Sequence, residues 1–151
     1  MEIFEFYKLS EERKAHWTDE MSKCDWDAGG FLVWMLKNDK FKEYCGKDAE
    51  VLLAAEGESL AGFCTLAEHD EIVSDTMKPW IGFVFTFPEF RGRRCSGHLT
   101  EYAVGLAKEA GYEKIYVSSE EKGLYEKYGF TFLEDAMSEH GYETQIFVRN
   151  I

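Results

Sequence analysis

The chain has 151 residues, a formal net charge of -12 at pH 7 and a hydrophobic share of 45%. This length and apolar content predict one domain, residues 1–151, with a substantial buried core. The negative charge argues against nucleic acid or an anionic membrane as a partner, because both recruit a broad basic face. We expect a cytoplasmic protein, since no apolar run approaches the ~18 residues of a membrane span and the first residues lack a secretory pattern.

The cysteines and histidines predict neither disulfides nor a metal site. The four cysteines lie far apart without a CxxC pair, so reduced thiols are expected. The four histidines show no metal-ligand spacing with one another or with the cysteines, so we predict no metal.

The first third of the chain predicts a strand followed by two helices. Residues 2–8 predict a first strand from Ile3, Phe4, Phe6 and Tyr7. Ser10 precedes two glutamates, a pattern typical of a helix N-cap with acids in the first turn. The segment CDWDAGG interrupts the helical spacing, which places a loop near residues 24–30 between the two helices.

The middle of the chain changes to the period of strands. The segment VLLAAEGESLAGFCTLAEHD contains two apolar runs around Glu56–Ser59, which predicts a β-hairpin. An acidic loop follows. WIGFVFTF, residues 80–87, is the strongest strand and is predicted to be central in the sheet.

The last third predicts alternating helices and strands. Apolar residues at helical spacing predict a helix over residues 97–110 that ends at Gly111. Residues 114–119 predict a strand, EEKGLYEKYG a short helix, and FTFLED and ETQIFV two closing strands. The whole order is typical of an α/β (α+β) domain with a mixed sheet flanked by helices.

The segment FPEFRGRRCSGHL, residues 87–99, concentrates positive charge between a strand and a helix. It contains Arg91, Arg93 and Arg94, with Gly92 and Gly97 allowing close approach of a ligand to the backbone. A turn that enters a helix presents unpaired N–H groups and the positive end of the helix dipole. The segment therefore predicts a site for a compact anion such as a diphosphate.

Two segments resemble the GNAT superfamily of N-acetyltransferases. PEFRGRRCSGHL is similar to the family's pyrophosphate-binding loop, Arg/Gln-x-x-Gly-x-Gly/Ala: Arg91 matches the first position, whereas Arg94 and Ser96 replace two small residues. GLYEKYGF, residues 123–130, resembles the family's LYEKxGF segment and follows at a similar distance. The order of elements over nearly the whole chain also agrees with the family fold.

The resemblance implies a GNAT-like, mostly antiparallel sheet in which two parallel strands, 80–87 and 114–118, splay apart around the cofactor. It implies acetyl-CoA as the co-substrate and direct transfer of the acetyl group to a primary amine through a tetrahedral intermediate. The implied cofactor-binding residues are Val84, Phe85, Thr86, Arg91, Gly92, Arg93, Arg94, Cys95, Ser96, Gly97 and Ser118.

The resemblance also suggests catalytic groups. Tyr125 aligns with the tyrosine that protonates the departing thiolate in many members of the family. The family often has a glutamate early in the central strand as general base, but Trp80 stands there. The remaining candidates for the base are Glu68, Asp70 and Glu71 in the acidic loop.

In this fold the acceptor pocket would contain Asp25, Trp26, Asp27, the acids of residues 68–75 and the loop at residues 134–143. This anionic and aromatic lining favours a cationic amine, either a small molecule or a peptide. A monomer and a homodimer are both compatible with the sequence.

Three other functions were considered. A non-catalytic acyl-CoA-binding sensor is the main alternative, because the strand glutamate is missing. A nucleotide-binding or phosphoryl-transfer protein ranks lower, since the chain lacks GxxxxGK[ST] and GxGxxG. A nucleic-acid binder is disfavoured by the negative charge.

Overall fold

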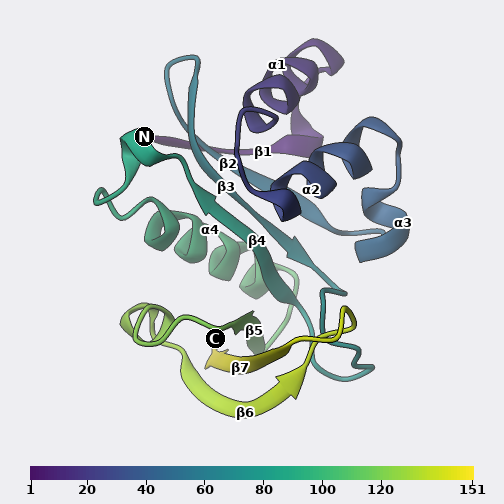
Figure 1. The fold of residues 1–151 in the computed structure, drawn as a ribbon, viewed down its shortest axis with the longest axis vertical. Coiled ribbons are helices and arrows are strands. Elements are labelled where there is room, and N and C mark those ends of the chain that lie inside the picture. Colours follow the sequence, from purple (N-terminus) through teal and green to yellow (C-terminus); the bar gives the residue numbers. More distant parts are fainter.

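The computed structural model describes residues 1–151 and contains one seven-stranded sheet of order β1-β2-β3-β4-β5-β7-β6 (Figure 1). All neighbouring strands are antiparallel except β4 and β5, which confirms the predicted mixed, mostly antiparallel sheet flanked by helices. None of the helices has the length and apolar character needed to cross a membrane. The strands are β1 (Glu2–Glu5), β2 (Glu50–Glu56), β3 (Ser59–Ala67), β4 (Trp80–Thr86), β5 (Lys114–Ser119), β6 (Thr131–Met137) and β7 (Glu143–Asn150).

Helices cover both faces of the sheet. Figure 1 shows α1 and α2 at one side of β2 and β3, with α4 running on the other side of the sheet. The helices are α1 (Glu11–Met21), α2 (Asp27–Lys37), α3 (Phe41–Cys45) and α4 (Cys95–Glu109), with 3-10 turns η1 (Phe6–Lys8), η2 (Pro88–Phe90) and η3 (Tyr125–Tyr128).

Strand β2 shows how the two layers are held to the sheet. Successive side chains of a strand point to opposite faces. Val51 and Leu53 accordingly pack in a core cluster with α1, α2 and α3, whereas Leu52 and Ala54 pack in a second cluster with α4. Because residues 51–55 are all buried, this strand reads as a continuous apolar run, as expected for a strand covered on both faces.

The N-terminal helices differ from the sequence prediction. Helix α2 begins at Asp27, inside the predicted loop, because Gly29 serves close packing and does not break the helix. A Cβ atom at Gly29 would lie 2.5 Å from Cys24 Sγ and 3.4 Å from the Phe63 ring. Helix α3, five residues long, was not predicted, and β1 ends at Glu5, earlier than expected.

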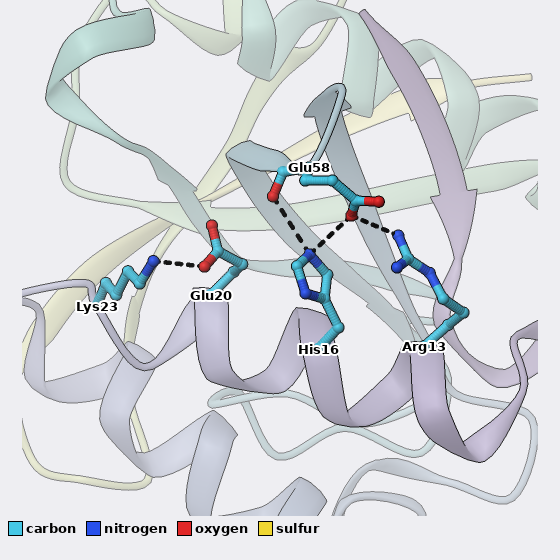
Figure 2. Close-up of polar contacts among 5 residues, drawn as sticks. All are labelled: Arg13, His16, Glu20, Lys23 and Glu58. Carbon is cyan, nitrogen blue, oxygen red and sulfur yellow. Dashed lines mark hydrogen bonds and ion pairs between the residues drawn. The ribbon is translucent and has the colours of Figure 1, made fainter.

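Helix α1 is fixed to the turn of the β2–β3 hairpin by polar contacts (Figure 2). Arg13 Nη2 donates to Glu58 Oε2 at 2.8 Å, and His16 Nε2 lies 3.1 Å from the same oxygen and 3.2 Å from the Glu58 carbonyl oxygen. The hydrogen bond from Arg13 lowers the pKa of Glu58. These exposed contacts orient the helix, while its buried residues Trp17 and Met21 supply the apolar packing.

The predicted N-cap of α1 is confirmed, because Ser10 Oγ accepts a hydrogen bond from the Arg13 backbone N–H at 3.2 Å. We expect Ser10→Ala to lower the free energy of unfolding by about 1 kcal/mol, since this N–H loses its partner. Urea denaturation measures the difference. Ser10→Asp is the matched control and should keep most of the stability, because its carboxylate can accept the same bond. Equal stability of Ser10→Ala and the parent would contradict the capping role.

Candidate functional site

Strands β4 and β5 pair for only a short distance and then separate. Their paired residues are Trp80 with Tyr116 and Ile81 with Val117. On its other side β4 continues to pair with β3, but the register shifts so that Phe83 and Val84 together lie opposite Cys64. This β-bulge, with Phe83 at a φ of 49°, bends β4 away from β5. The residues of β4 beyond Ile81 therefore have no strand partner on the β5 side.

The loop between β4 and α4 presents a row of unpaired backbone donors. The N–H groups from Gly92 to Gly97 donate to no acceptor in the protein, and the first amide of this region with a partner is that of His98, which donates to the Arg94 carbonyl at 3.0 Å. These donors lie at the N-terminus of α4, where the helix dipole adds partial positive charge. The arrangement is suited to hold a phosphate group.

A cavity of about 320 Å³ lies at this loop. Thr86, the last residue of β4, lines this cavity, so the cavity lies at the end of that strand. The residues lining it are Thr86, Phe90, Arg91, Gly92, Arg94, Cys95, Ser96, Leu124, Lys127 and Tyr128.

The basic side chains of the loop have different positions. Arg91 lines the cavity, and its Nε donates to the Thr86 carbonyl at 3.1 Å. Arg93 points to the β2–β3 hairpin, where its Nη1 lies 3.4 Å from the Glu56 carboxylate, and it does not line the cavity. Lys127 does line it, although the sequence analysis did not single this residue out. The only signal for Lys127 was its place in the LYEKYGF segment.

Tyr128 supports the first turn of α4. Its hydroxyl lies 2.8 Å from Ser96 Oγ, within hydrogen-bond distance. A Cβ atom at Gly97 would lie 3.0 Å from the Tyr128 ring, so glycine at this position lets the ring pack closely against the helix. Cys95 is buried in the core behind the same turn. The first turn of α4 thus contacts η3 through Ser96 and Gly97, and the core through Cys95.

Tyr125 lies in the core cluster on the α4 side of the sheet. It is 4% exposed and packs edge-on against Phe130 and Tyr128. The same cluster contains Cys64, the residue opposite the bulge of β4. Burial, with a smaller effect of Cys64, raises the pKa of the Tyr125 phenol above its usual value. The hydroxyl is therefore protonated at neutral pH and available as a donor.

Asp70 lies directly against the central strand. A Cβ atom at Gly82 of β4 would lie 2.2 Å from Asp70 Oδ1, so the carboxylate occupies the space that any other side chain would fill. Burial raises the pKa of Asp70 to about 7, and the neighbouring carboxylates of Glu71 and Glu139 act in the same direction. The structure thus places a carboxyl group of near-neutral pKa beside the bulge. No local pattern in the chain indicated that Gly82 makes room for it.

The other two candidate bases have different surroundings. Glu68 accepts a hydrogen bond from the Asp48 backbone N–H at 3.1 Å and does not line a described cavity. Glu71 Oε2 accepts from Ser118 Oγ at 2.7 Å, whereas Glu71 Oε1 is buried without a partner. Burial raises the pKa of Glu71 as well. Ser118, expected at the cofactor, is thus bonded to the acidic loop.

A second cavity of about 740 Å³ lies on the α2 and α3 side of the sheet. Trp26 and Asp27 line it as predicted, whereas Asp25 lines a separate cavity of about 360 Å³. Phe85, expected at the cofactor, stacks on Trp26 with ring centroids 5.8 Å apart. The lining residues are Trp26, Asp27, Ala28, Phe31, Met35, Tyr44, Cys45, His69, Asp70, Glu71, Phe83, Glu139, His140 and Tyr142.

Residues 2–130 match the Acetyltransferase (GNAT) family. The chain belongs to this family. Its fold is similar to the crystal structure of aminoglycoside 6'-acetyltransferase type Ii, with a TM-score of 0.73 and 14% identity over 99% of this chain and 97% of that chain. No curated protein sequence matches the chain.

Two solved structures with a bound ligand also share the fold. An aminoglycoside 6'-N-acetyltransferase complexed with coenzyme A has a TM-score of 0.68 and 13% identity, over 99% of this chain and 97% of that chain. A GNAT family acetyltransferase from Elizabethkingia anophelis with acetyl-CoA bound has a TM-score of 0.58 and 15% identity, over 76% of this chain and 82% of that chain. At these identities the likeness shows the fold alone.

The loop of this GNAT chain has a left-handed residue that is not glycine. Arg94 stands at the glycine position of the loop pattern and adopts the left-handed conformation, with φ 59° and ψ 29°. A residue with a Cβ atom adopts this conformation at a cost of roughly 1–2 kcal/mol. The loop geometry is therefore maintained by its surroundings and not by the residue at position 94.

We expect Arg94→Gly to leave the free energy of unfolding within about 0.5 kcal/mol of the parent, because relief of the left-handed strain offsets the greater freedom of glycine in the unfolded chain. Arg94→Val should lower it by about 1–2 kcal/mol, since a β-branched residue disfavours this conformation most. Urea denaturation of the two variants checks the difference. A valine variant as stable as the glycine variant would show that the left-handed backbone is not constrained.

Proposed function

We propose that the protein transfers the acetyl group of acetyl-CoA to a primary amine by direct attack through a tetrahedral intermediate. The observation that carries this proposal is the row of unpaired amides from Gly92 to Gly97 beside the open half of β4. Membership of the GNAT family supports acetyl transfer. The bound coenzyme A and acetyl-CoA in two solved structures of the same fold support the identity of the co-substrate.

The cofactor would be held from its pyrophosphate to its thioester. The amides of the loop bind the pyrophosphate, and Arg91, Arg94 and Lys127 supply positive charge around the same cavity. Beyond the loop, Val84, Phe85 and Thr86 have no strand partner on the β5 side, so the main chain there would contact the pantetheine and the acetyl carbonyl. The Thr86 carbonyl is already bonded to Arg91 Nε. A backbone donor aimed at the acetyl carbonyl stabilises the oxyanion of the intermediate.

Asp70 is the general base of this proposal. An alkylammonium with a pKa near ~10.4 must lose a proton before its nitrogen lone pair can attack the acetyl carbon. The Asp70 carboxylate lies in the large cavity and against Gly82, one residue before the bulge. With a pKa of about 7, an appreciable fraction of Asp70 is ionised at neutral pH and can accept this proton.

Tyr125 is the general acid. When the intermediate collapses, the carbon–sulfur bond breaks and the thiolate of coenzyme A takes the proton of the phenol. Tyr125 belongs to the buried cluster that includes Cys64, opposite the bulge, so it approaches this part of β4 from the α4 side. Asp70, in contrast, lies with α2 and α3. The acid and the base thus come from opposite faces of the sheet, as transfer through the gap requires.

The role of Tyr125 can be separated from binding. Tyr125→Phe should lower kcat by about 10²-fold or more while leaving the affinity for coenzyme A within about threefold, because only the proton donor is removed. Steady-state rates with a panel of amines and calorimetric titration with coenzyme A measure the two quantities.

Tyr102→Phe is the control for this experiment. Its hydroxyl donates to Glu5 at 2.8 Å, and Tyr102 lines none of the cavities described above, so both quantities should stay unchanged. No heat with coenzyme A or acetyl-CoA would overturn the proposed function. Tight binding without turnover of any amine would favour an acyl-CoA-binding sensor instead.

The base should be visible in the pH profile. We expect kcat/KM to rise with pH and to level off above about pH 7, because Asp70 accepts a proton only when it is ionised. Asp70→Asn should lower kcat/KM by about 10²-fold or more and remove this limb of the profile. Retention of the limb in Asp70→Asn would assign the titration to another group.

Gly82→Ala tests the same assignment without changing Asp70. The new Cβ would lie 2.2 Å from Asp70 Oδ1, so the carboxylate must move and activity should fall while the protein stays folded. Gly105→Ala, in the middle of α4 with nothing within 4 Å of the new Cβ, is the matched control. It should keep full activity. Equal activity of the two alanine variants would show that the position of Asp70 is not important.

A further inference from the structure

The large cavity has two unlike walls. One consists of loop residues from the β3–β4 and β6–β7 connections, among them Asp70, Glu71 and Glu139, together with two histidines. No lysine or arginine lines the cavity. The second wall is mainly aromatic, and its rings are those of Trp26, Phe31, Tyr44 and Phe83, with the acid Asp27 at the start of α2. Tyr142, from the β6–β7 connection, adds a further ring to the lining.

The aromatic wall extends into an exposed stack at the cavity mouth. The Phe31 ring lies 6.0 Å from Trp34 at an interplanar angle of 10°, and 6.4 Å from Tyr44 at 25°. The exposed fractions are 44% for Phe31, 45% for Trp34 and 50% for Tyr44. A group of large rings exposed together on a surface marks a place where an apolar ligand binds. Parallel rings of this kind suit a flat ligand.

Negative charge is placed at the inner end of the cavity. The Asp70 carboxylate lies against Gly82, and Glu71 Oε1 is buried without a hydrogen-bond donor in the protein. Together with Glu139 and Asp27, these carboxyl groups line the cavity without a lysine or arginine among them, so the lining favours a cation. Trp26, stacked on Phe85 and edge-on to Phe83, lies over the bulge and offers its ring to a cation.

We propose that the acceptor is a primary amine attached through a short chain to an aromatic ring system, the aryl-alkylamine class. This inference rests on the proposed function. The ammonium group is held at Asp70 and Glu71, and the ring lies along Phe31 and Tyr44. Asp70 takes one proton from the ammonium group, and the nitrogen forms the amide bond with the acetyl carbon as the carbon–sulfur bond breaks. The coenzyme A thiolate takes the proton of Tyr125, and the second proton that the nitrogen loses restores the Tyr125 phenol.

The alternative acceptor is a polyhydroxylated amino sugar. Such a molecule presents hydroxyl groups on all sides, and the rings of Phe31 and Phe83 offer no hydrogen-bond partner to those that face them. An amine with one charged end and one apolar end matches both walls. The shared fold with two aminoglycoside acetyltransferases, at 14% and 13% identity, does not change this chemical argument.

The test compares primary amines attached to an aromatic ring system with primary amines attached to a hydroxylated sugar. Initial rates with acetyl-CoA should give 2-phenylethylamine and tryptamine a kcat/KM about 10-fold or more above that of glucosamine and kanamycin, because only the aryl-alkylamines bury apolar surface on the aromatic wall. A higher kcat/KM for either amino sugar would overturn the proposal.

Variants of the wall provide the second readout. Tyr44→Ala should raise KM for 2-phenylethylamine about 10-fold with little change in coenzyme A affinity, whereas Tyr44→Phe, which keeps the ring, should stay within about twofold. Phe132→Ala is the control, because Phe132 is 51% exposed on β6 and does not line the cavity. Equal KM values for Tyr44→Ala and Phe132→Ala would overturn the proposal.

The two proposals fail in different ways. If acetyl-CoA gives no heat of binding and no amine of either class is acetylated, the proposed function is wrong and the inference on the acceptor fails with it. If amino sugars are acetylated in preference to aryl-alkylamines, the proposed function holds and only the inference on the acceptor is wrong.

Discussion

The separation of β4 from β5 is the constraint on which the rest of the site depends. A strand in the middle of a sheet normally satisfies its backbone on both sides, and β4 does so only as far as Ile81. The bulge at Phe83 and Val84 then turns the strand away while β3 still pairs with it. The sheet therefore stays continuous through its antiparallel pairs and leaves one backbone edge open inside the protein.

In the proposed reaction, groups from opposite faces of the sheet would act at this opening. Tyr125 belongs to the core between the sheet and α4, while Asp70 borders the cavity formed with α2 and α3. In a fully paired sheet, the strands would separate these two side chains. The loop at the N-terminus of α4 follows the open part of β4, and its cavity includes Thr86 at the end of that strand.

The sequence was sufficient for elements with a strong local signal. Strand β5 was predicted with its observed bounds, and the Ser10 cap of α1 and the end of α4 near Gly111 follow from local chemistry. Helix α3 was missed because its five residues carry too little periodicity to show a helix. The prediction that β4 and β5 separate came from the resemblance of two short segments to a known family. Hydrophobic periodicity does not show how far two strands stay paired.

The site was predictable only where its residues are neighbours in the chain. The expectation of a phosphate site at the loop follows from its place before a helix, and its free amides agree with that expectation. Arg93, in contrast, turns to Glu56, which is near in space but distant in sequence. The place of Asp70 depends on the absence of a side chain at Gly82, and the aromatic wall brings together Phe31 and Tyr44 from different helices. Such contacts are set by tertiary packing and have no signal in a single sequence.

The position of Asp70 also has a thermodynamic consequence for the whole chain. Its pKa is about 7 in the folded protein, against a model-peptide value of ~3.9. Between these two pH values the folded chain retains a proton that the unfolded chain has released. By linkage, the contribution of this group to folding is most favourable below about pH 4 and is lost as the pH rises through about 7. The protonation state that suits proton abstraction is thus the one that weakens the native state, and the remaining core must compensate for it.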